Sequence, residues 1–441
     1  MTGIYRLTDV ARCPRAITLG FGGHLVYQIV TNLMQLVIFE DDATAQLNPL
    51  ALSKPAFEIT CGGYRLSELL AQLQCPMRAL VRPHLQSLIA ADHRFDIHNS
   101  QELLLAVNAR LVPNVANLQS IRKIAEDAKP GVSRNNGAIA VAVFPKTRDL
   151  EFSNPSDFCD AIDAFQLPRF EDDFPLIEYP HDIIKRHVCE FGSNLLLRLQ
   201  QGQYRQIDEG VFSSDPKMVI DDTVRFDAQC GPIVFERGVK IRPFVFLRGP
   251  AHFADNVRIN EHCSIKDNVF VGANSKVGGE IEESIIEPYS NKQHHGYLGH
   301  SYVGSWVNLG AGTCNSDLKN TYGNIRCEYG DKRVDTEMQF LGCMIGDYTK
   351  TAVNTSIFTG KVIGACSALY GFVTSNVPSF ANYARSFGQV TDMPPNVIID
   401  MQRRMFARRQ LEQQPRDVQL IEQMYKIACQ ERQLEEGPPR F

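Results

Sequence analysis

Residues 239–277 read VKIRPFVFLRGPAHFADNVRINEHCSIKDNVFVGANSKV, and every sixth position from the third onward is apolar. A six-residue period fits neither a helix, whose apolar face recurs every 3.6 residues, nor an array of hairpins. It does fit a solenoid in which each hexapeptide forms one short strand and one turn. The same position then points inward on every face and stacks on its counterpart one coil away, about 4.8 Å along the axis. These positions are Ile241, Leu247, Phe253, Ile259, Ile265, Val271 and Val277.

The period has a companion series and recurs further along the chain. Two residues earlier in each repeat, the chain carries Val239, Val245, Ala251, Val257, Cys263 and Val269. The spacing returns at Tyr297, Val303 and Leu309, and again at Ile345, Ile357, Ile363 and Leu369, with Thr351 as a polar member. Ordinary strands that happen to be in phase are the alternative, but seven successive matches disfavour it. We predict a left-handed parallel β-helix over residues 216–392.

Two segments break the period, and a charged stretch follows the repeats. The interruptions span Ile281–Gly296 and Thr313–Met338. Excursions from a rigid scaffold often carry functional side chains, because the coils hold them in place. After Pro394-Pro395, the amphipathic pattern of Val397–Gln433 predicts a helical tail over residues 393–441. We expect this tail to cap the open end of the solenoid, which would otherwise be an exposed sheet edge.

The N-terminal part alternates strand-like and helix-like segments. Apolar runs at Leu36–Phe39, Leu103–Val107 and Ala138–Phe144 flank a helical pattern at Ser67–Leu73. This alternation predicts an α/β domain with a mostly parallel sheet over residues 34–150, extending to about 180. A Pro-, Asp- and Phe-rich linker at Glu151–Pro180 precedes a helical linker over residues 181–215, which contains the helical stretch Asp182–Leu199. Residues 1–33 are expected to be an extension that the fold does not need.

Composition places the chain among multidomain globular proteins. Its 441 residues suffice for two or three units, and 44% hydrophobic and 22% charged residues are ordinary globular usage. A net charge of -5 without long basic runs argues against a nucleic-acid partner. Twelve cysteines occur singly, without a CxxC pair, which indicates reduced thiols in a cytoplasmic protein. The stretch Ile17–Phe39 is interrupted by polar residues, so neither a signal peptide nor a membrane span is expected.

The run NKQHHGYLG at 291–299, followed by VNLGAGT at 307–313, carries a family resemblance. It resembles the bifunctional N-acetylglucosamine-1-phosphate uridyltransferase / glucosamine-1-phosphate acetyltransferase family, and in particular its divergent, GlmU-like bacterial branch. The resemblance implies an acyltransferase β-helix that uses acetyl-CoA on a sugar phosphate or nucleotide sugar and forms a homotrimer with shared sites. It also implies that His294, three residues before Tyr297, is the catalytic base. Glu280, fourteen residues before His294, matches a further family position.

The resemblance also assigns binding residues. Residues that match substrate-binding positions are Arg248 in a phosphate-contacting turn, Lys292, Tyr297, Asn308, Asn315 and Lys319. Asp347 and Ala365 match positions that contact acetyl-CoA. Two departures concern phosphate recognition: a family lysine is Glu282 here, and the lysine of the histidine motif is displaced by one to Lys292. An anion in place of a cation, or a shifted cation, alters which phosphorylated sugar can bind.

The N-terminal domain resembles the same branch more faintly. Leu36–Glu40, Asn48–Leu50, Ser53–Glu58 and Gly62 resemble its opening segment. The glycine-rich loop that cradles phosphate in ordinary nucleotidyltransferases is missing. Asn108 replaces the aspartate that would bind Mg²⁺, and a neutral amide is a weaker ligand for this hard dication. We therefore expect weak or absent uridylyl transfer, with Mg²⁺ as the candidate cofactor of this domain. The alternative is that the segment 49–62 binds another nucleotide sugar.

The expected chemistry is acyl transfer to an amine, which requires a general base and donors for the oxyanion. A neutral histidine suits the base near pH 7, so no metal ligand is assigned. One alternative is a zinc protein of the γ-carbonic-anhydrase type, with His295, His300 and either His262 or His252 as ligands. The other alternative is a trimer that binds nucleotide sugars and has lost catalysis, because a fold does not fix a function.

Overall fold

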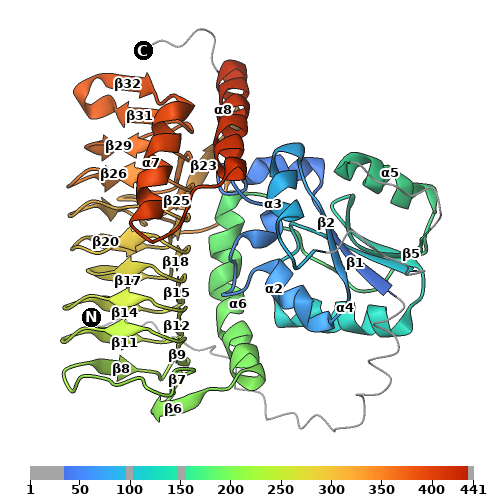
Figure 1. The fold of residues 1–441 in the computed structure, drawn as a ribbon, viewed down its shortest axis with the longest axis horizontal. Coiled ribbons are helices and arrows are strands. Elements are labelled where there is room, and N and C mark those ends of the chain that lie inside the picture. The colour runs from blue at the N-terminus through green and yellow to red at the C-terminus, as the bar shows by residue number, and fades with distance from the viewer. Residues whose placement is uncertain (1–33, 96–102, 147–153, 436–441) are drawn as a thin grey trace, which may run out of the picture.

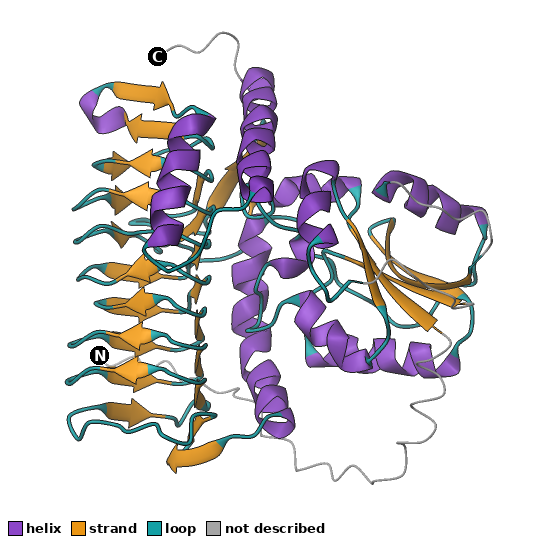
Figure 2. Ribbon diagram, viewed as in Figure 1, coloured by secondary structure: helices purple, strands orange, loops and turns teal. Residues whose placement is uncertain are grey.

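The computed structural model describes residues 34–95, 103–146 and 154–435, which form an α/β domain, a parallel β-solenoid and a helical tail (Figure 1). The long helix α6 (Pro180–Gln201) lies between the α/β domain and the solenoid, as Figure 2 shows. The fold class expected from the sequence is confirmed in these three parts. The expectation for residues 1–33 lies outside the described residues.

The α/β domain contains one five-stranded sheet with the order β2-β1-β3-β5-β4. β1 (Met34–Phe39) runs parallel to β2 (Met77–Leu80) and to β3 (Leu103–Asn108). However, β5 (Ala138–Pro145) is antiparallel to both β3 and β4 (Gly131–Asn135), so the sheet is mixed and not mostly parallel. The reason is a tight turn at Asn136-Gly137, where both residues have positive φ and join β4 to β5 as a hairpin.

Short helices cover this sheet. They are η1 (Asp42–Leu47), η2 (Ala56–Glu58), α2 (Leu66–Leu70), η3 (Ala71–Leu73), η4 (Pro83–Leu85), α3 (Gln86–Ala90), α4 (Val115–Asp127) and α5 (Pro155–Ala164). α5 falls inside the stretch that the sequence predicts to be a linker. Its N-cap Asn154 accepts a hydrogen bond from the main-chain N–H of Asp157, and Phe158 and Ile162 are buried.

The solenoid has three parallel faces. The first comprises β8 (Arg225–Asp227), β11 (Phe246–Arg248), β14 (Ser264–Lys266), β17 (Glu280–Glu282) and β20 (Tyr297–Gly299), and continues as β22 (Cys314–Asn315), β27 (Ser356–Ile357) and β30 (Phe372–Val373). The second comprises β7 (Val211–Ser213), β9 (Ile233–Phe235), β12 (Ala251–Phe253), β15 (Val269–Val271), β18 (Ile285–Ile286), β21 (Tyr302–Val303), β25 (Cys343–Ile345) and β28 (Lys361–Ile363), with β6 (Arg205–Asp208) at its edge. The third comprises β10 (Lys240–Ile241), β13 (Arg258–Ile259), β16 (Lys276–Val277), β19 (Asn291–Lys292), β26 (Lys350–Thr351), β29 (Ala368–Leu369) and β31 (Ala381–Ala384).

One coil is shorter than the others, and this explains the first break in the period. Ile259 pairs with Val277, 18 residues later, whereas Val277 pairs with Lys292, only 15 residues later. The segment 281–296 therefore stays in the solenoid and is not an excursion. Because the register is kept, Lys292 occupies the inward position that Ile259 and Val277 fill in the coils before it.

The second break is a true excursion. After β22 the chain leaves the coil and forms the antiparallel hairpin of β23 (Arg326–Tyr329) and β24 (Lys332–Asp335). Tyr329 stacks on Tyr179, with ring centroids 4.8 Å apart, and its hydroxyl lies 2.7 Å from Nδ1 of His181. The hairpin thus ties the solenoid to the start of α6.

The helical tail lies beside the solenoid, which corrects the expected cap over its end. α7 (Pro395–Ala407) and α8 (Pro415–Glu435) run along the last coils in Figure 1. Phe406 of α7 packs on Trp306 at 4.7 Å, and Tyr425 of α8 packs edge-on against Phe380 at 5.2 Å. The last coil is closed instead by β32 (Gln389–Asp392), which pairs antiparallel with β31 after the short helix η5 (Arg385–Phe387).

Across the described ranges, no helix combines the length and apolar character that crossing a membrane requires. The cysteines within those ranges are free thiols.

Candidate functional site

His294 lies in a tight loop between β19 and β20, at the corner where the third face turns into the first. The main chain of this loop is fixed from two sides. Lys292 donates hydrogen bonds from Nζ to the carbonyl oxygens of Gly278, His294 and Gly296, at 2.9, 2.9 and 2.7 Å. From the next coil, the N–H of Gly312 donates to the carbonyl of His295 at 3.1 Å. The side chains of His294 and His295 are exposed, so a rigid loop presents two accessible imidazoles.

Lys292 has a different role from the expected phosphate contact. Only 3% of the residue is exposed, and its three donors serve the three carbonyls. Burial lowers the pKa of Lys292 to about 8. An ammonium group inside the solenoid is tolerated because carbonyl oxygens replace its water shell. Lys292 therefore shapes the His294 loop from within and has no donor left for a phosphate.

Tyr297 and Glu280 are neighbours on the first face. The register pairs Glu280 with Tyr297, one rung apart. Lys266 forms an ion pair with Glu280 at 2.8 Å, while the hydroxyl of Tyr297 donates to Asp317 at 2.7 Å and lies 3.4 Å from a carboxylate oxygen of Glu282. Burial, and then the hydrogen bond to Asp317, raise the pKa of Tyr297 well above its ordinary value. Tyr297 is therefore a hydrogen-bond donor and not a base.

A charged network that the sequence does not reveal lies beside Tyr297. His300 follows β20 and lies between two carboxylates, with Nδ1 2.8 Å from Asp317 and Nε2 2.7 Å from Glu283. Burial opposes the charge on His300, but these two hydrogen bonds outweigh it and raise its pKa to about 9. The ring also stacks on Phe340 at 5.3 Å. His300 is thus a cation near neutral pH and cannot accept a proton there.

Asn308, Asn315 and Lys319, which the resemblance assigns to substrate binding, form contacts with main-chain groups instead. Asn315 is buried and forms two bonds with Gly299, accepting from its N–H at 2.9 Å and donating to its carbonyl at 3.0 Å. Asn308 bridges Asn291 and Lys350 through main-chain pairing on the third face. Lys319 donates to the carbonyl of Asn324 at 2.6 Å within the excursion. Asn315 belongs to the His294 site as a support for β20, whereas Asn308 and Lys319 lie outside this cluster of contacts.

Arg248 is separated from this cluster. It belongs to β11, and the first face places β14 and β17 between β11 and β20. Three rungs correspond to about 14 Å along the axis. Both ends of its guanidinium are engaged by the carboxylate of Asp267, with Nε 2.7 Å from Oδ1. The structure does not bring Arg248 to the His294 loop.

Asp347 and Ala365 are both buried, and Asp347 lies under the α/β domain. Asp347 forms an ion pair with Lys54 at 3.1 Å and accepts hydrogen bonds from Ser53 Oγ at 2.6 Å and from the N–H of Ser305 at 2.8 Å. Ala365 is fully buried. Lys54 and Ser53 of the α/β domain occupy the carboxylate of Asp347, and Ala365 has no exposed surface, so neither residue is kept as a cofactor contact.

The same interface includes the segment 49–62, for which the sequence suggests nucleotide-sugar binding as an alternative. Besides Ser53 and Lys54, the N–H of Thr60 donates to Glu287 at 2.9 Å, and the hydroxyl of Tyr302 donates to the same carboxylate at 2.7 Å. Burial opposes ionisation of Glu287, but the nearby cations Lys54 and Arg65 outweigh it, so its pKa is lowered. The segment therefore docks the domain on the solenoid.

The zinc alternative lacks a ligand set. In the described residues, no group of three or more His, Cys, Asp or Glu side chains is placed to hold a metal ion. Both ring nitrogens of His300 contact carboxylates, His252 contacts Glu236 at 3.1 Å, and His262 stacks on Phe244 at 5.2 Å. These histidines are held apart by their own partners.

At the strand end where the family resemblance places a magnesium-binding aspartate, an arginine is bound to Asp41. Arg110 donates from Nε and Nη2 to the two carboxylate oxygens of Asp41, at 2.8 and 2.6 Å. The amide of Asn108 is also engaged, with Nδ2 2.9 Å from Asp41 and Oδ1 accepting from the N–H of Arg110 at 2.9 Å. The buried guanidinium of Arg110 occupies the place beside Asp41 that a metal cation would need, so these residues do not fit Mg²⁺.

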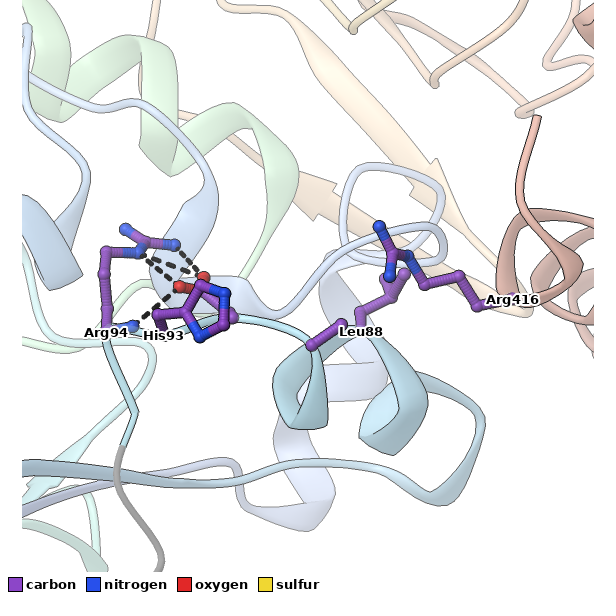
Figure 3. Close-up of a pocket in the computed structure, with 6 residues that line it drawn as sticks. Leu88, His93, Arg94 and Arg416 are labelled. Carbon is purple, nitrogen blue, oxygen red and sulfur yellow. Dashed lines mark hydrogen bonds and ion pairs between the residues drawn. The ribbon is translucent and has the colours of Figure 1, made fainter. Parts of the chain in front are cut away.

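Three pockets lie outside the His294 loop. A pocket of about 260 Å³ at the end of β1 includes Asp41, Asp42 and Arg134. A pocket of about 600 Å³ lies between the α/β domain, the hairpin, the last coils and α8. The third, about 550 Å³, lies between α3 and the start of α8 and is drawn in Figure 3, where Arg94 is bound to Asp92. None of them contains His294.

Comparison with known proteins relates the chain to two activities. Residues 36–199 match the family model described as sugar nucleotidyl transferase. A bifunctional sugar-1-phosphate nucleotidylyltransferase/acetyltransferase from Sulfurisphaera tokodaii is 27% identical over 166 residues, which is 37% of this chain and 40% of that protein. The bifunctional protein GlmU of Thermotoga maritima is 29% identical over 129 residues, 29% of this chain and 26% of that protein. The resemblance to GlmU-like proteins is thereby confirmed at low identity.

The matches are partial. The chain spans two fifths or less of the length of these relatives. Among solved structures, the polySia-specific acetyltransferase NeuO is 18% identical, with a TM-score of 0.14, over 38% of this chain and 78% of that chain.

Proposed function

We propose that this protein transfers an acetyl group from acetyl-CoA to an amino group on a sugar phosphate or nucleotide sugar, with His294 as the general base. The proposal rests on the geometry of the His294 loop, which combines a fixed main chain with an exposed imidazole. The main chain is fixed by Lys292 and Gly312, while the imidazole of His294 is exposed. The similarity to bifunctional nucleotidylyltransferase/acetyltransferases supports this choice of reaction.

The reaction needs little from the protein beyond positioning and one proton acceptor. The amine nitrogen of the sugar attacks the thioester carbonyl, and a new C–N bond forms as the C–S bond breaks. His294 takes the proton from the nitrogen, and the departing thiolate is protonated as coenzyme A. His300 cannot replace His294 near neutral pH, because its two carboxylate partners keep it charged. Tyr297 and the carboxylates around it would orient the amino sugar through hydrogen bonds.

An exposed strip of apolar residues lies above the loop and supports both coenzyme A binding and a homotrimer. It consists of Val353, Phe358, Tyr370, Phe372 and Phe387, which are 65, 48, 39, 60 and 71% exposed. Main-chain hydrogen bonds connect successive coils at the corner that carries the His294 loop. The N–H of Gly312 donates to the carbonyl of His295, and the N–H of Asn354 donates to the carbonyl of Ala311. Contiguous exposed apolar groups are typical of interaction sites. We propose that a neighbouring subunit covers this strip and that the pantetheine arm lies in the groove so formed.

For the α/β domain, we infer that nucleotidyl transfer is weak or absent. Arg110 fills the position at Asp41, and the segment 49–62 docks the domain on the solenoid. The domain would then serve to hold the second face of the solenoid and α6 in place. A trimer that binds nucleotide sugars without catalysis remains the outcome to separate from this proposal.

The test is release of free coenzyme A thiol from acetyl-CoA across a panel of amino sugars, their 1-phosphates and their nucleotide conjugates. We expect thiol release with at least one phosphorylated acceptor, together with a trimer by light scattering. Binding of a nucleotide sugar by calorimetry without any thiol release would support the non-catalytic alternative. A monomer at all concentrations would contradict a shared site.

A further inference from the structure

A column of cations runs along the third face of the solenoid. Lys240 pairs with Arg258, and Arg258 pairs with Lys276, on three consecutive rungs. Ile259 and Val277, which follow Arg258 and Lys276, are fully buried, and Ile241, which follows Lys240, is partly buried. Because side chains alternate across a strand, the three cations point outward, with rungs about 4.8 Å apart.

The end of α7 brings two more cations to this column. Arg409 donates from Nη2 to Oδ1 of Asn291 at 3.1 Å, and Asn291 pairs with Lys276. Arg409 is therefore one rung from Lys276, and Arg408 precedes it in the chain. Burial and then the charges of Arg409, Arg258 and Arg408 lower the pKa of Lys276, as expected for neighbouring like charges.

Carboxylates do not form ion pairs with this column in the part of the chain that the structure describes. Within residues 34–95, 103–146 and 154–435, none of these five cations forms an ion pair, and the buried Nε of Arg258 has no hydrogen-bond partner. The first face differs, because its cations Arg248 and Lys266 are paired with Asp267 and Glu280. Like charges on adjacent strands destabilise a sheet. A surface that holds several unpaired cations close together is therefore suited to bind an anion.

We propose that this column, defined as Lys240, Arg258, Lys276, Arg408 and Arg409, binds a small ligand that carries two or more linked phosphate groups. The spacing and number of the cations favour several phosphates over one, and arginine binds phosphate oxygens through two donors at once. The site lies on the third face and does not include His294, so it is separate from the proposed acetyl-transfer site. The ligand class is the polyphosphate of a nucleotide, of coenzyme A or of inorganic origin.

The chain supplies a reporter at the site. Its single tryptophan, Trp306, stacks on Tyr289 with ring centroids 4.3 Å apart, and Tyr289 lies near enough to Arg409 to influence the pKa of its guanidinium. Titration of the full chain with inorganic tripolyphosphate, followed by calorimetry and by Trp306 fluorescence, should show saturable binding. Inorganic phosphate should bind at least about tenfold more weakly. Absence of heat and of a fluorescence change with tripolyphosphate would overturn the proposal.

Variants then locate the binding. Lys276→Met and Arg409→Gln should each weaken tripolyphosphate binding by about tenfold or more, as expected for one lost charge-assisted contact. Lys217→Gln, which removes an exposed cation from an early loop of the solenoid, should leave it unchanged. Lys276→Met should keep or raise the melting temperature, since it relieves repulsion. Unchanged affinity in both variants, or a lower melting temperature for Lys276→Met, would show that the cations only support the fold.

Three further titrations identify which class of phosphate-containing ligand the column binds. UTP, a UDP-sugar and coenzyme A are titrated in parallel, and a tighter Kd than that of tripolyphosphate names the natural class. Tighter binding of a single-stranded oligonucleotide than of all of these would overturn the small-ligand proposal. His294→Ala should bind tripolyphosphate as the parent does, so failure of the acetyltransferase proposal would not affect this result.

Discussion

Replacement of Lys292 by methionine should change the pH dependence of stability more than stability itself. The substitution removes three hydrogen bonds to main-chain carbonyls, worth about 1 kcal/mol each. It also removes a buried charge, and lowering the pKa of Lys292 from 10.5 to about 8 corresponds to roughly 3 kcal/mol of unfavourable free energy. The two effects nearly cancel near pH 7. Lys292→Met should therefore unfold within about 1.5 kcal/mol of the parent at that pH.

The sign of the pH effect follows from proton binding. Because folding lowers the pKa of Lys292, the unfolded chain binds more protons between pH 8 and 10.5, and the parent gains stability as the pH rises through this window. Lys292→Met loses that gain. Urea unfolding at several pH values should give a stability difference between parent and variant that grows by roughly 3 kcal/mol from pH 8 to 10.5. The control Lys266→Met breaks the part-buried ion pair with Glu280, so its stability difference should not grow across this window. A flat difference for Lys292→Met would refute the buried-ammonium interpretation.

Three further predictions test the surrounding structure. Lys54→Met should destabilise the protein by about 3–5 kcal/mol, because it leaves Asp347 buried and unpaired, and a urea midpoint close to the parent's would argue against this contact. With UTP or dTTP, hexose 1-phosphates and Mg²⁺, pyrophosphate release should be weak or absent, because Arg110 occupies the carboxylate of Asp41; robust turnover would disprove that reasoning. Folding raises the pKa of His300 to about 9, so its stabilisation is complete below pH 6.5 and disappears as the pH rises through 9. His300→Gln should thus cost on the order of 3 kcal/mol at pH 6 and little at pH 10, and an equal cost at both pH values would contradict the network.

The repeats were predictable because the solenoid places the same chemical demand on every coil. Ile259 and Val277 point into one narrow core, so an apolar residue recurs at a fixed spacing. The inward position of Lys292 cannot be predicted from the repeat, because this coil is three residues shorter and places a polar residue where the other coils have an apolar one. Only the three carbonyls around its ammonium make that position tolerable, and their convergence is a property of the folded chain.

The charged network beside Tyr297 cannot be predicted from the sequence for a related reason. His300, Glu283 and Asp317 belong to different coils and meet only when those coils stack. A resemblance that assigns roles position by position also cannot tell which face another domain covers. Asp347 was therefore assigned to a cofactor, although Lys54 of the α/β domain binds it.

The most direct test of the central claim compares two adjacent histidines. His294 and His295 share one loop and are both exposed, so His295→Ala is a matched control for His294→Ala. With the acceptor found in the thiol-release screen, His294→Ala should lower kcat by roughly 10²- to 10⁴-fold, with KM and melting temperature close to the parent's. His295→Ala should change kcat by much less. If His294→Ala retains the parent's kcat, or if the two variants lose activity equally, His294 is not the general base.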